Sequence, residues 1–329
     1  MNKYAQLQNA HLSTGYKITY EENCTIFNFE NQETAGTIFC YKIFPGLHIT
    51  LNKIEGEYLP NLLHMFSNDS FKQYTIINYC QKGRCEVSLD DNIFVYQTTG
   101  DFSIAKSFSQ NGFYFPQKYY EGIELFVDLQ EMKSISQFLD NNFNIHIENI
   151  VHKLLVDHTI FISKCSTELE NLFHVIWSCH NTENALFNIR MRILELFYLL
   201  EHSSFTSHDY KHFTATQKEI ARKTHEIITT NIDQHFSARL LADKFKISES
   251  SLKKYFKGIY GQNISFYLKD LRLETAAKLL INSKLSVNEI ANKVGYLNQS
   301  KFSAVFKEHF HVTPLEYRKQ RALEQLGEN

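Results

Sequence analysis

The stretch that decides the fold occurs twice in the last third of the chain. Residues 237–260 read SARLLADKFKISESSLKKYFKGIY, and residues 286–310 read SVNEIANKVGYLNQSKFSAVFKEHF. In each stretch, apolar residues recur at helical spacing, a short turn follows, and a second helical run begins behind a polar capping residue. Each is therefore predicted to be a helix–turn–helix motif, and two motifs in series are a much more specific signal than one.

Start signals support the helices of this region. Capping boxes, in which two side chains satisfy backbone donors reciprocally, are predicted for Thr216 with Glu219 and for Ser286 with Glu289. Thr313 followed by Pro314 predicts another helix start, because the donor that Pro lacks has no helical partner at this position. Asn298 is placed to cap the helix that begins at Gln299.

The apolar spacing assigns an inner and an outer face to each motif. The inner residues of the first motif are predicted to be Leu240, Leu241, Ala242, Phe245, Leu252, Phe256 and Ile259. Those of the second are Ile290, Ala291, Val294, Phe302, Val305 and Phe306, with a turn at Gly295. The second helix of each motif then points outward with Ser250, Lys253, Lys254 and Lys257, and with Gln299, Ser300, Lys301, Ala304 and Lys307.

Residues 263–282 (NISFYLKDLRLETAAKLLIN) are predicted to form one helix between the motifs. A helix of this length spans about 30 Å, close to the ~34 Å of one turn of B-DNA. It can hold the two second helices at neighbouring major-groove segments on one side of a duplex. The pattern thus predicts a domain that reads double-stranded DNA, with outward residues of each second helix facing base edges.

Residues 215–320 resemble the AraC/XylS-type transcription regulators. The matching runs are Arg272-Leu273-Glu274, Ala276, Leu279-Leu280, Ser286-Val287, Glu289-Ile290-Ala291, Val294-Gly295-Tyr296, Gln299-Ser300, Phe302-Ser303, Phe306-Lys307, Phe310, Thr313-Pro314 and Tyr317-Arg318. The resemblance implies an all-helical domain with two motifs, promoter binding, and contact with RNA polymerase during activation. It also implies base-reading positions at Ser250, Lys253 and Lys254, and at Gln299, Ser300, Lys301 and Ala304.

The outward side chains differ in what they offer to DNA. Lysines such as Lys257 and Lys307 are expected to contact phosphates, or to be no more than a solvated helix face, whereas Gln299 can pair bidentately with adenine. Lys246 in the first turn and His311 after the last recognition helix stand where the family usually has Gly. Since a left-handed non-Gly residue costs about 1–2 kcal/mol, a differently shaped first turn is one hypothesis. His311 is expected to be a tolerated helix cap.

Charge is divided unevenly along the 329 residues, whose net charge is −2. Residues 214–329 carry 19 Lys and Arg against 12 Asp and Glu, a net charge of +7, whereas residues 1–213 have a net charge of −9. Only the C-terminal part is therefore expected to meet phosphate. Chance asymmetry is the alternative.

Residues 1–130 are predicted to form a β-rich domain. Short strand-like segments alternate with turn signals at Gly83 and at residues 90–92; they are residues 74–80, 85–89, 93–96, 102–105 and 123–129. This spacing is typical of an antiparallel sandwich or barrel, and the run Gly100–Ile104 resembles the cupin-like sensor of many such regulators. A dense aromatic group either lines an effector pocket or packs the core; it comprises Phe113, Tyr114, Phe115, Tyr119, Tyr120 and Phe126.

Residues 131–212 are predicted to be a helical linker and dimerisation segment. The apolar spacing becomes helical near Met132, with short helices around residues 135–139, 150–155 and 169–177 and a long one over residues 183–202. One stripe of the long helix is either core or a dimer seam; it contains Leu186, Ile189, Ile193, Leu196, Phe197 and Leu200. Residues 203–212 are polar and form the predicted connection to the C-terminal domain, residues 213–321.

The sequence argues against membrane insertion, export and a disulfide scaffold. It contains no apolar run near 18 residues, and residues 1–14 lack the apolar region of an export signal, so a cytoplasmic protein is expected. The six cysteines include no C-x-x-C pair and are expected to be free thiols. Cys80 and Cys85 are interpreted as buried strand residues, with a redox pair across a hairpin as the alternative.

Enzyme chemistry and a bound metal or cofactor are not expected. The phosphate-cradling and nucleophile motifs of common enzyme classes are missing from the sequence. A cupin enzyme needs clustered metal ligands. His48 and His64 are isolated in the sequence, the six-residue spacing of His146, His152 and His158 does not place them on one helix face, and His309 and His311 lie at the end of a recognition helix.

The sequence therefore predicts an α+β multidomain protein with an N-terminal antiparallel β-barrel or jelly roll, a helical linker and a C-terminal all-α domain with two motifs. It is expected to be a sequence-specific transcription regulator that acts on double-stranded DNA as a homodimer, responds to an unknown small-molecule effector and binds no membrane. One alternative is a regulator controlled by a protein partner or by no effector. A second is a cupin-type enzyme with an accessory DNA-binding tail.

Overall fold

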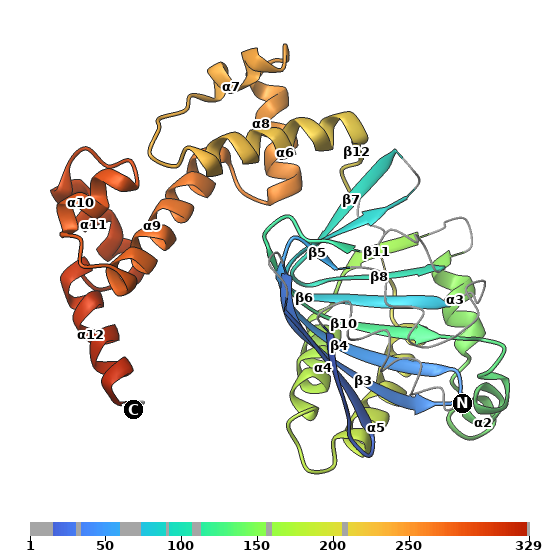
Figure 1. Ribbon diagram of the computed structural model, residues 1–329. Coiled ribbons are helices and arrows are strands. Elements are labelled where there is room, and N and C mark those ends of the chain that lie inside the picture. The colour runs from blue at the N-terminus through green and yellow to red at the C-terminus, as the bar shows by residue number, and fades with distance from the viewer. Residues whose placement is uncertain are drawn as a thin grey trace. The chain divides into compact units, whose positions relative to one another are not determined.

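The computed structural model describes residues 16–30, 34–59, 74–89, 92–106, 113–155, 160–205 and 210–327. The chain divides into two compact units, Met1–His212 and Phe213–Asn329 (Figure 1). Each unit has a hydrophobic core of its own. Several predicted features lie outside the described residues, namely His64, His158, residues 90 and 91 of a predicted turn, and residues 206–209 of the predicted connection.

The first unit is built on an antiparallel sheet, as predicted. Its strands are β1 (Tyr16–Tyr20), β2 (Cys24–Glu30), β3 (Thr34–Phe44), β4 (Leu47–Gly56), β6 (Thr75–Ser88), β7 (Ile93–Thr98), β8 (Asp101–Lys106), β10 (Tyr119–Val127) and β11 (Ile160–Lys164). They follow the order β1-β2-β3-β4-β10-β6-β7, with β8 also on β6 and β11 on β8. A separate small pair joins β5 (Tyr58–Leu59) to β9 (Phe113–Tyr114).

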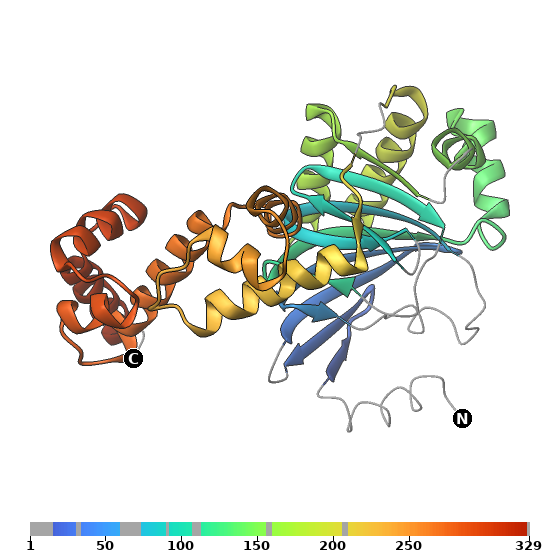
Figure 2. The ribbon, with the colours of Figure 1, turned by 90° about the horizontal axis from the view of Figure 1, so that it is seen from above.

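The sheet is open, so the predicted closure into a barrel is wrong. Among the described strands, β1 pairs with β2 alone and no pairing returns from β11 to β1. A barrel buries its apolar face by closing on itself, whereas helices cover one face of this sheet (Figure 2). The apolar residues of that face and the helices share one core, so the burial that closure would provide comes from the helices. The jelly-roll arrangement is not confirmed.

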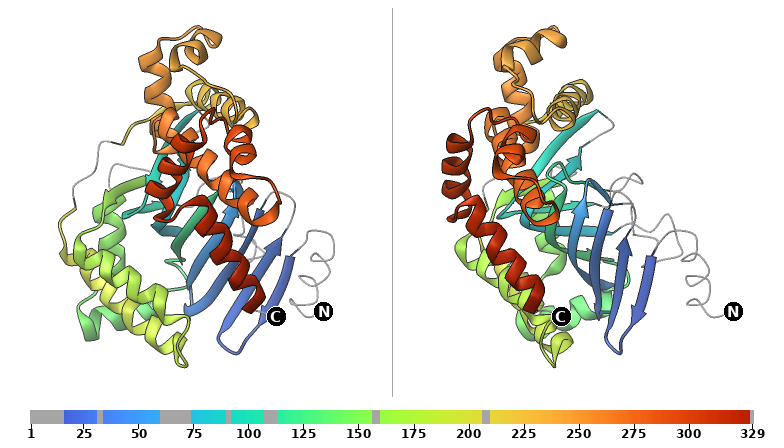
Figure 3. Two further views of the ribbon diagram at one scale, coloured as in Figure 1. Left: turned by 90° about the vertical axis from the view of Figure 1, so that its left-hand side faces the viewer. Right: turned by 60° about the vertical axis from the view of Figure 1, so that its left-hand side comes forward.

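The covering helices are α2 (Lys133–Phe143), α3 (Ile147–Leu155), α4 (Thr167–Cys179) and α5 (Ala185–His202). They confirm the four helices that the spacing predicted, and Figure 3 shows α4 and α5 beside the strands. Most of the stripe predicted on α5 is fully buried with the sheet: Ile189, Ile193, Leu196, Phe197 and Leu200, while Leu186 is partly buried. The interpretation of this stripe as core is thus confirmed, and its interpretation as a dimer seam is wrong.

The predicted turn at Gly83 is also wrong, because β6 runs through it as one strand. Gly83 has a φ of 87°, and a Cβ there would lie 2.2 Å from the Tyr119 carbonyl oxygen, so the strand passes this point only without a side chain. Cys80 and Cys85 therefore lie on the same strand and no hairpin separates them. Both are free and buried in one apolar cluster, and burial raises the pKa of the Cys80 thiol to about 12. The cluster also holds Phe115 stacked on Tyr120.

The second unit is helical, as predicted. After the short strand β12 (Phe213–Thr214) come α6 (Ala215–Thr230), α7 (Ala238–Lys244), α8 (Glu249–Tyr260), α9 (Ile264–Asn282), α10 (Val287–Lys293), α11 (Gln299–Phe310) and α12 (Pro314–Gly327). The central helix α9 packs against α6 and α8 and also against α10 and α12. None of the described helices in either unit combines the length and apolarity needed to cross a bilayer.

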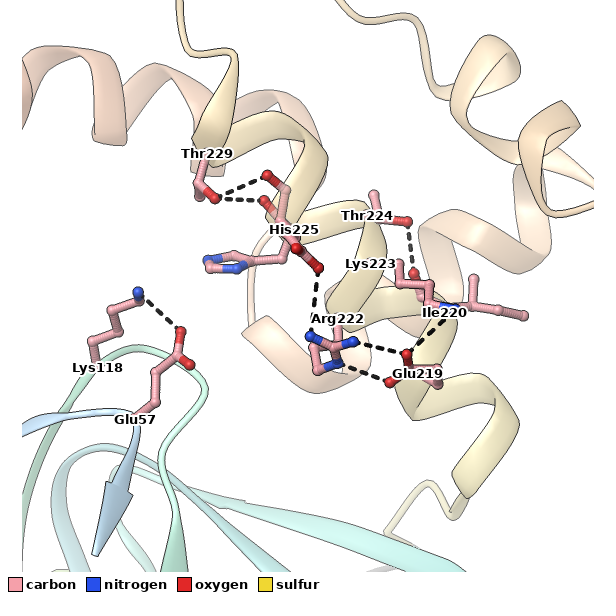
Figure 4. Close-up of polar contacts among 10 residues, drawn as sticks. Glu57, Lys118, Glu219, Ile220, Arg222, Lys223, Thr224, His225 and Thr229 are labelled. Carbon is pink, nitrogen blue, oxygen red and sulfur yellow. Dashed lines mark hydrogen bonds and ion pairs between the residues drawn. The ribbon is translucent and has the colours of Figure 1, made fainter. Parts of the chain in front are cut away.

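Helix α6 starts two residues earlier than predicted. Thr214 is its N-cap and forms a capping box with Gln217, so the predicted box between Thr216 and Glu219 is wrong. Glu219 instead accepts two hydrogen bonds of 2.8 Å from Arg222 (Figure 4). The Arg222 guanidinium lowers the pKa of Glu219 to about 2. The side chain of Gln217 accepts the hydrogen bond from the Thr214 backbone amide. Glu219 is therefore not needed at the helix start and pairs with Arg222.

Candidate nucleic-acid interface

The first motif consists of α7 and α8, each capped by a serine. The Leu240 amide donates to Ser237 Oγ (3.1 Å), and the Ser251 amide donates to Ser248 Oγ (3.1 Å). Most predicted inner residues are buried, namely Leu241, Ala242, Leu252, Phe256 and Ile259, while Phe245 is partly buried. Leu240 is 63% exposed, so its predicted inward position is wrong. Its neighbour Leu241 fills the inner face, and a helix of seven residues turns only one side to the core.

The second motif consists of α10 and α11. Ser286 and Glu289 form the predicted capping box, and Asn298 accepts from the Lys301 amide (2.9 Å) as predicted. The predicted inner residues Ile290, Ala291, Val294, Phe302 and Phe306 are buried, and Val305 is partly buried. Both second helices are thus fixed at their first turns by side-chain caps.

The two motifs repeat one construction. Helices α7 and α10 start 49 residues apart, and α8 and α11 start 50 residues apart. The ring contacts repeat as well: Phe256 meets Tyr267 edge-on at 5.6 Å and 83°, and Phe306 meets Tyr317 at 5.5 Å and 83°. The third helix of each repeat, α9 or α12, therefore packs on its second helix through equivalent aromatic residues.

The turns also match, although only one contains Gly. Lys246 has a φ of 55° and Gly295 a φ of 82°, and the residue after each donates to the Ala242 or the Ala291 carbonyl. The hypothesis of a differently shaped first turn is thus wrong, and Lys246 bears the left-handed cost of about 1–2 kcal/mol. His311 is the left-handed cap of α11, as predicted, with φ 63° and its amide 2.8 Å from the Lys307 carbonyl.

Arg272, in the middle of α9, ties both repeats together. It is 7% exposed. Its Nε donates to the Ile232 carbonyl (2.8 Å) and its Nη2 to the Gln234 carbonyl (2.7 Å), both in the segment before α7. The guanidinium also lies over the Tyr296 ring of the second motif, 5.9 Å from its centroid. One side chain therefore holds the entry to the first motif and the turn of the second.

The outward residues named from the sequence lie where the periodicity places them. All nine are exposed: Ser250, Lys253, Lys254 and Lys257 on α8, and Gln299, Ser300, Lys301, Ala304 and Lys307 on α11. The structure therefore gathers them into one surface on each second helix. These surfaces are formed by capped helices over a fixed core, which is the arrangement that a rigid base-reading element needs.

Local partners distinguish the two surfaces. Lys253 Nζ lies 2.5 Å from Glu249 Oε1, one turn away on α8. Ser250 Oγ shares a hydrogen bond of 2.9 Å with the capping hydroxyl of Ser248. Two of the four outward residues of α8 thus already have partners within their own helix, and DNA would compete with these partners for them.

Sequence reasoning missed the role of Arg272, which was noted only as part of a family match. The available signal was a cation in the interior of an apolar helix, since an arginine at such a position needs acceptors. Arg318 on α12 has a similar role that was also missed: its Nε and Nη2 donate to the Leu280 and Leu285 carbonyls (3.1 and 2.6 Å). Leu297, 91% exposed directly before the Asn298 cap, was likewise not singled out.

Fold and surface together define a DNA-binding domain with two helix–turn–helix motifs. Residues 241–320 match the helix-turn-helix domain family. The chain is 26% identical over 168 residues to the lactose operon transcription activator of Staphylococcus xylosus, covering 50% of this chain and 60% of that protein. It is 42% identical over 76 residues to the xylose operon regulatory protein of Escherichia coli K12, covering 23% and 19%.

A solved structure is also similar in sequence over this region. It is a transcriptional regulator of Chromobacterium violaceum described as containing an AraC-type DNA-binding domain, 30% identical, with a TM-score of 0.30 and coverage of 33% of this chain and 96% of that chain. Residues 241–320 of the present chain thus form a helix-turn-helix domain, and this part of the chain is similar to the transcription regulators named above. The chain spans less than two thirds of either curated relative, and both relatives are named as regulators, not enzymes.

Proposed function

We propose that this protein is a sequence-specific regulator of transcription whose second unit binds promoter DNA. The observation that carries the proposal is the repeated motif pair, with α8 and α11 exposed on their outer faces and held by α9 and Arg272. The net charge of +7 over residues 214–329 supports contact with phosphate. An activating complex would also contact RNA polymerase.

Within this proposal, α8 and α11 occupy neighbouring major-groove segments. Gln299, Ser300, Lys301 and Ala304 would face base edges from α11, and Ser250, Lys253 and Lys254 from α8. Lys257 and Lys307, one turn further along, would contact phosphate. Since α9 has 19 residues, it spans about 28 Å, which suits neighbouring segments of one duplex face.

The first unit would supply control, with a cupin-like sensor in residues 1–130 and a helical dimerisation segment in residues 131–212. A buried polar row on the sheet supports a ligand-responsive role. Thr50, Glu124, Asn78 and Ser103 are register neighbours across β4, β10, β6 and β8, and all are buried. Burial raises the pKa of Glu124 to about 7, and Asn78 Nδ2 donates to it at 3.0 Å. A buried polar group costs stability unless it has a hydrogen-bond partner. Thr50 Oγ1, in this row, is buried and has no such partner among the described residues, and a small polar effector would supply one.

Selection of bound duplexes from a random pool tests the DNA-binding proposal. Enrichment of one sequence by the full chain is expected, with a site that spans two neighbouring major-groove segments. Uniform recovery of all sequences at every salt concentration would contradict it. The same selection with cell extract tests for an effector.

Thermal-shift screening of the full chain against small metabolites tests the sensor role. A ligand at a hundred times its dissociation constant should add about 2.7 kcal/mol to the stability of the unit that binds it. A regulator controlled by a protein partner would show sequence-specific DNA binding and no stabilising metabolite. The described residues contain no group of three or more His, Cys, Asp or Glu placed to hold a metal ion, so the screen is designed around organic molecules.

A further inference from the structure

The turn of the second motif is one residue longer than the turn of the first. In the first motif a single residue, Ile247, lies between the left-handed residue of the turn and the serine that caps α8. In the second motif Tyr296 and Leu297 lie between the left-handed glycine and the asparagine that caps α11. The amides of Ile247 and Tyr296 donate to equivalent carbonyls of the preceding helices. These two residues therefore match, and Leu297 is the inserted one.

Leu297 has no role in the packing of its own motif. Its side chain is 91% exposed, more than any other large apolar side chain among the described residues. An apolar residue directly before a helix cap often packs on the fourth residue of the helix. In α11 that residue is Phe302, which is fully buried and meets the ring of Tyr296 instead, with 5.4 Å between the centroids. Packing therefore does not account for a leucine at this position.

The inserted leucine lies at the end of α11 that the proposed function directs into the major groove. Gln299, Ser300 and Lys301 follow it closely in the chain, and all three are exposed. The N-terminal residues of such a second helix are the ones that approach base edges. A leucine side chain has no hydrogen-bonding group for a phosphate or a base, so only an apolar group gains from its approach. Among the base edges of the major groove, the apolar group is the C5-methyl of thymine.

We propose that Leu297 is a specificity-determining residue that packs on the methyl group of one thymine in the major groove. The inference rests on the proposed function, because it adds a base contact to the same surface of α11. Leu297 and Gln299 are two residues apart, so their Cα atoms are at most about 7.6 Å apart. One base-pair step is about 3.4 Å. Allowing for the reach of both side chains, the thymine lies within about three base pairs of the base that Gln299 contacts.

The contact belongs to the second motif alone. The first motif lacks the inserted residue, and Ile247, the last residue before its cap, is partly buried. A preference for a thymine methyl is therefore expected in the part of the DNA site that α11 contacts and not in the part that α8 contacts.

Replacement of thymine by uracil tests the contact, because uracil lacks only the C5-methyl group. Each thymine is replaced in turn in the duplex that the full chain enriches. At one position near the base contacted by Gln299, the unchanged chain should bind about fourfold more weakly without the methyl. Leu297→Ala should weaken binding to the thymine duplex by at least the same factor and should then bind the uracil duplex equally well. Losses that multiply, as independent effects do, would overturn the proposal.

A matched variant and a second modified base complete the test. Leu315→Ala is the control, because Leu315 is 64% exposed at the start of α12, outside both second helices; this variant should keep the full effect of uracil. At the same position, 5-methylcytosine restores the methyl on a different base pair. The unchanged chain should bind it about fourfold better than cytosine, and Leu297→Ala should not distinguish the two. Equal binding of both by the unchanged chain would overturn the proposal.

The outcomes separate this inference from the proposed function. A chain that selects one sequence, with no thymine methyl whose effect depends on Leu297, contradicts only the inference. A chain that enriches no sequence overturns both. If Leu297→Ala binds every duplex as the unchanged chain does but loses activation of transcription, the proposal is overturned and Leu297 is assigned to contact with a protein partner.

Discussion

The two helix–turn–helix motifs share one internal framework and differ on the surface. Equivalent ring pairs, caps and left-handed turns fix both frameworks, with Phe256 and Tyr267 in the first matched by Phe306 and Tyr317 in the second. On the surface, Glu249 begins α8 where Gln299 begins α11. The interior of such a motif is therefore set by packing, while its exposed positions remain free to take different tasks.

The difference suggests how the tasks are divided. The exposed face of α8 carries three lysines, one of them paired to Glu249, whereas that of α11 carries Gln299, Ser300 and Ala304 beside two lysines. Lysines mainly supply affinity for phosphate, and amides read base edges. We infer that the first motif contributes chiefly affinity and the second chiefly sequence preference.

The largest expected effect is a loss of stability on substitution in the turn of the second motif, which the turn of the first motif should not show. Gly295→Ala should destabilise the second motif by about 4 kcal/mol, because it adds left-handed strain and overpacking. The new Cβ would lie 2.7 Å from both Arg272 Nη2 and the Asp233 carbonyl oxygen. Amide hydrogen exchange of α10 and α11 in the full chain measures the loss. Lys246→Ala is the control, since that turn is already left-handed without Gly; equal effects of the two changes would contradict the difference.

Arg272→Met should cost about 3 kcal/mol. The substitution removes the two hydrogen bonds that the charged guanidinium donates, and the carbonyls of Ile232 and Gln234 lose this donor. Arg318→Met should cost roughly half as much, because Arg318 is only partly buried. Urea unfolding of the full chain gives both values. Because Arg272 contacts both motifs, its loss should speed amide hydrogen exchange in α7 and in α10. Faster exchange in only one of the two motifs would contradict the view that Arg272 links them.

The sequence was sufficient to predict buried residues and helix starts where local periodicity or capping alone determines them. Helical periodicity predicted the buried Phe256 and Phe306, and the capping chemistry of Ser286 and Asn298 predicted two helix starts. Prediction from the sequence failed where tertiary contacts determine the local structure or the burial of a residue. Gly83 is compatible with a turn, yet the close passage of Tyr119 keeps β6 continuous. Leu240 is as apolar as Leu241, and only the position of the short helix α7 exposes it.

Features that depend on residues far apart in the chain could not be predicted from the sequence for a related reason. Whether a sheet closes depends on which strands become its edges, and that depends on the helices that cover it. The acceptors of Arg272 are carbonyls 40 and 38 residues earlier in the chain, and no local pattern links them to it.

Gln299→Ala tests whether the second motif supplies sequence preference. We expect a loss of about 2 kcal/mol at one base position and relaxed selectivity there, because a bidentate amide contact is removed. Repeating the duplex selection with the variant measures this. Lys307→Ala, on the same helix but assigned to phosphate, is the control and should leave every base preference unchanged. A preference that survives Gln299→Ala would assign base reading to other residues.

Lys246→Gly tests the cost that the first turn bears. Since the left-handed geometry costs a lysine about 1–2 kcal/mol, which is partly offset by the greater freedom of Gly in the unfolded chain, a gain of about 1 kcal/mol is expected. Hydrogen exchange of α7 and α8 measures it. Because the exposed face is untouched, DNA affinity should stay constant; destabilisation by Gly would mean that the Lys246 side chain makes a contact worth more than the strain.

The smallest expected effects concern the lysines of α8. Lys257→Ala should weaken binding to every duplex by about fivefold at 0.15 M salt and should lower the salt slope by about one, because one phosphate contact is lost. Lys253→Ala should lower the slope by less, since Glu249 already neutralises part of its charge. Glu249→Ala should therefore raise the affinity for DNA and increase the effect of a subsequent Lys253→Ala. Binding isotherms across a salt series give all three slopes, and equal slopes for the Lys257 and Lys253 variants would show that the Glu249 ion pair does not persist on DNA.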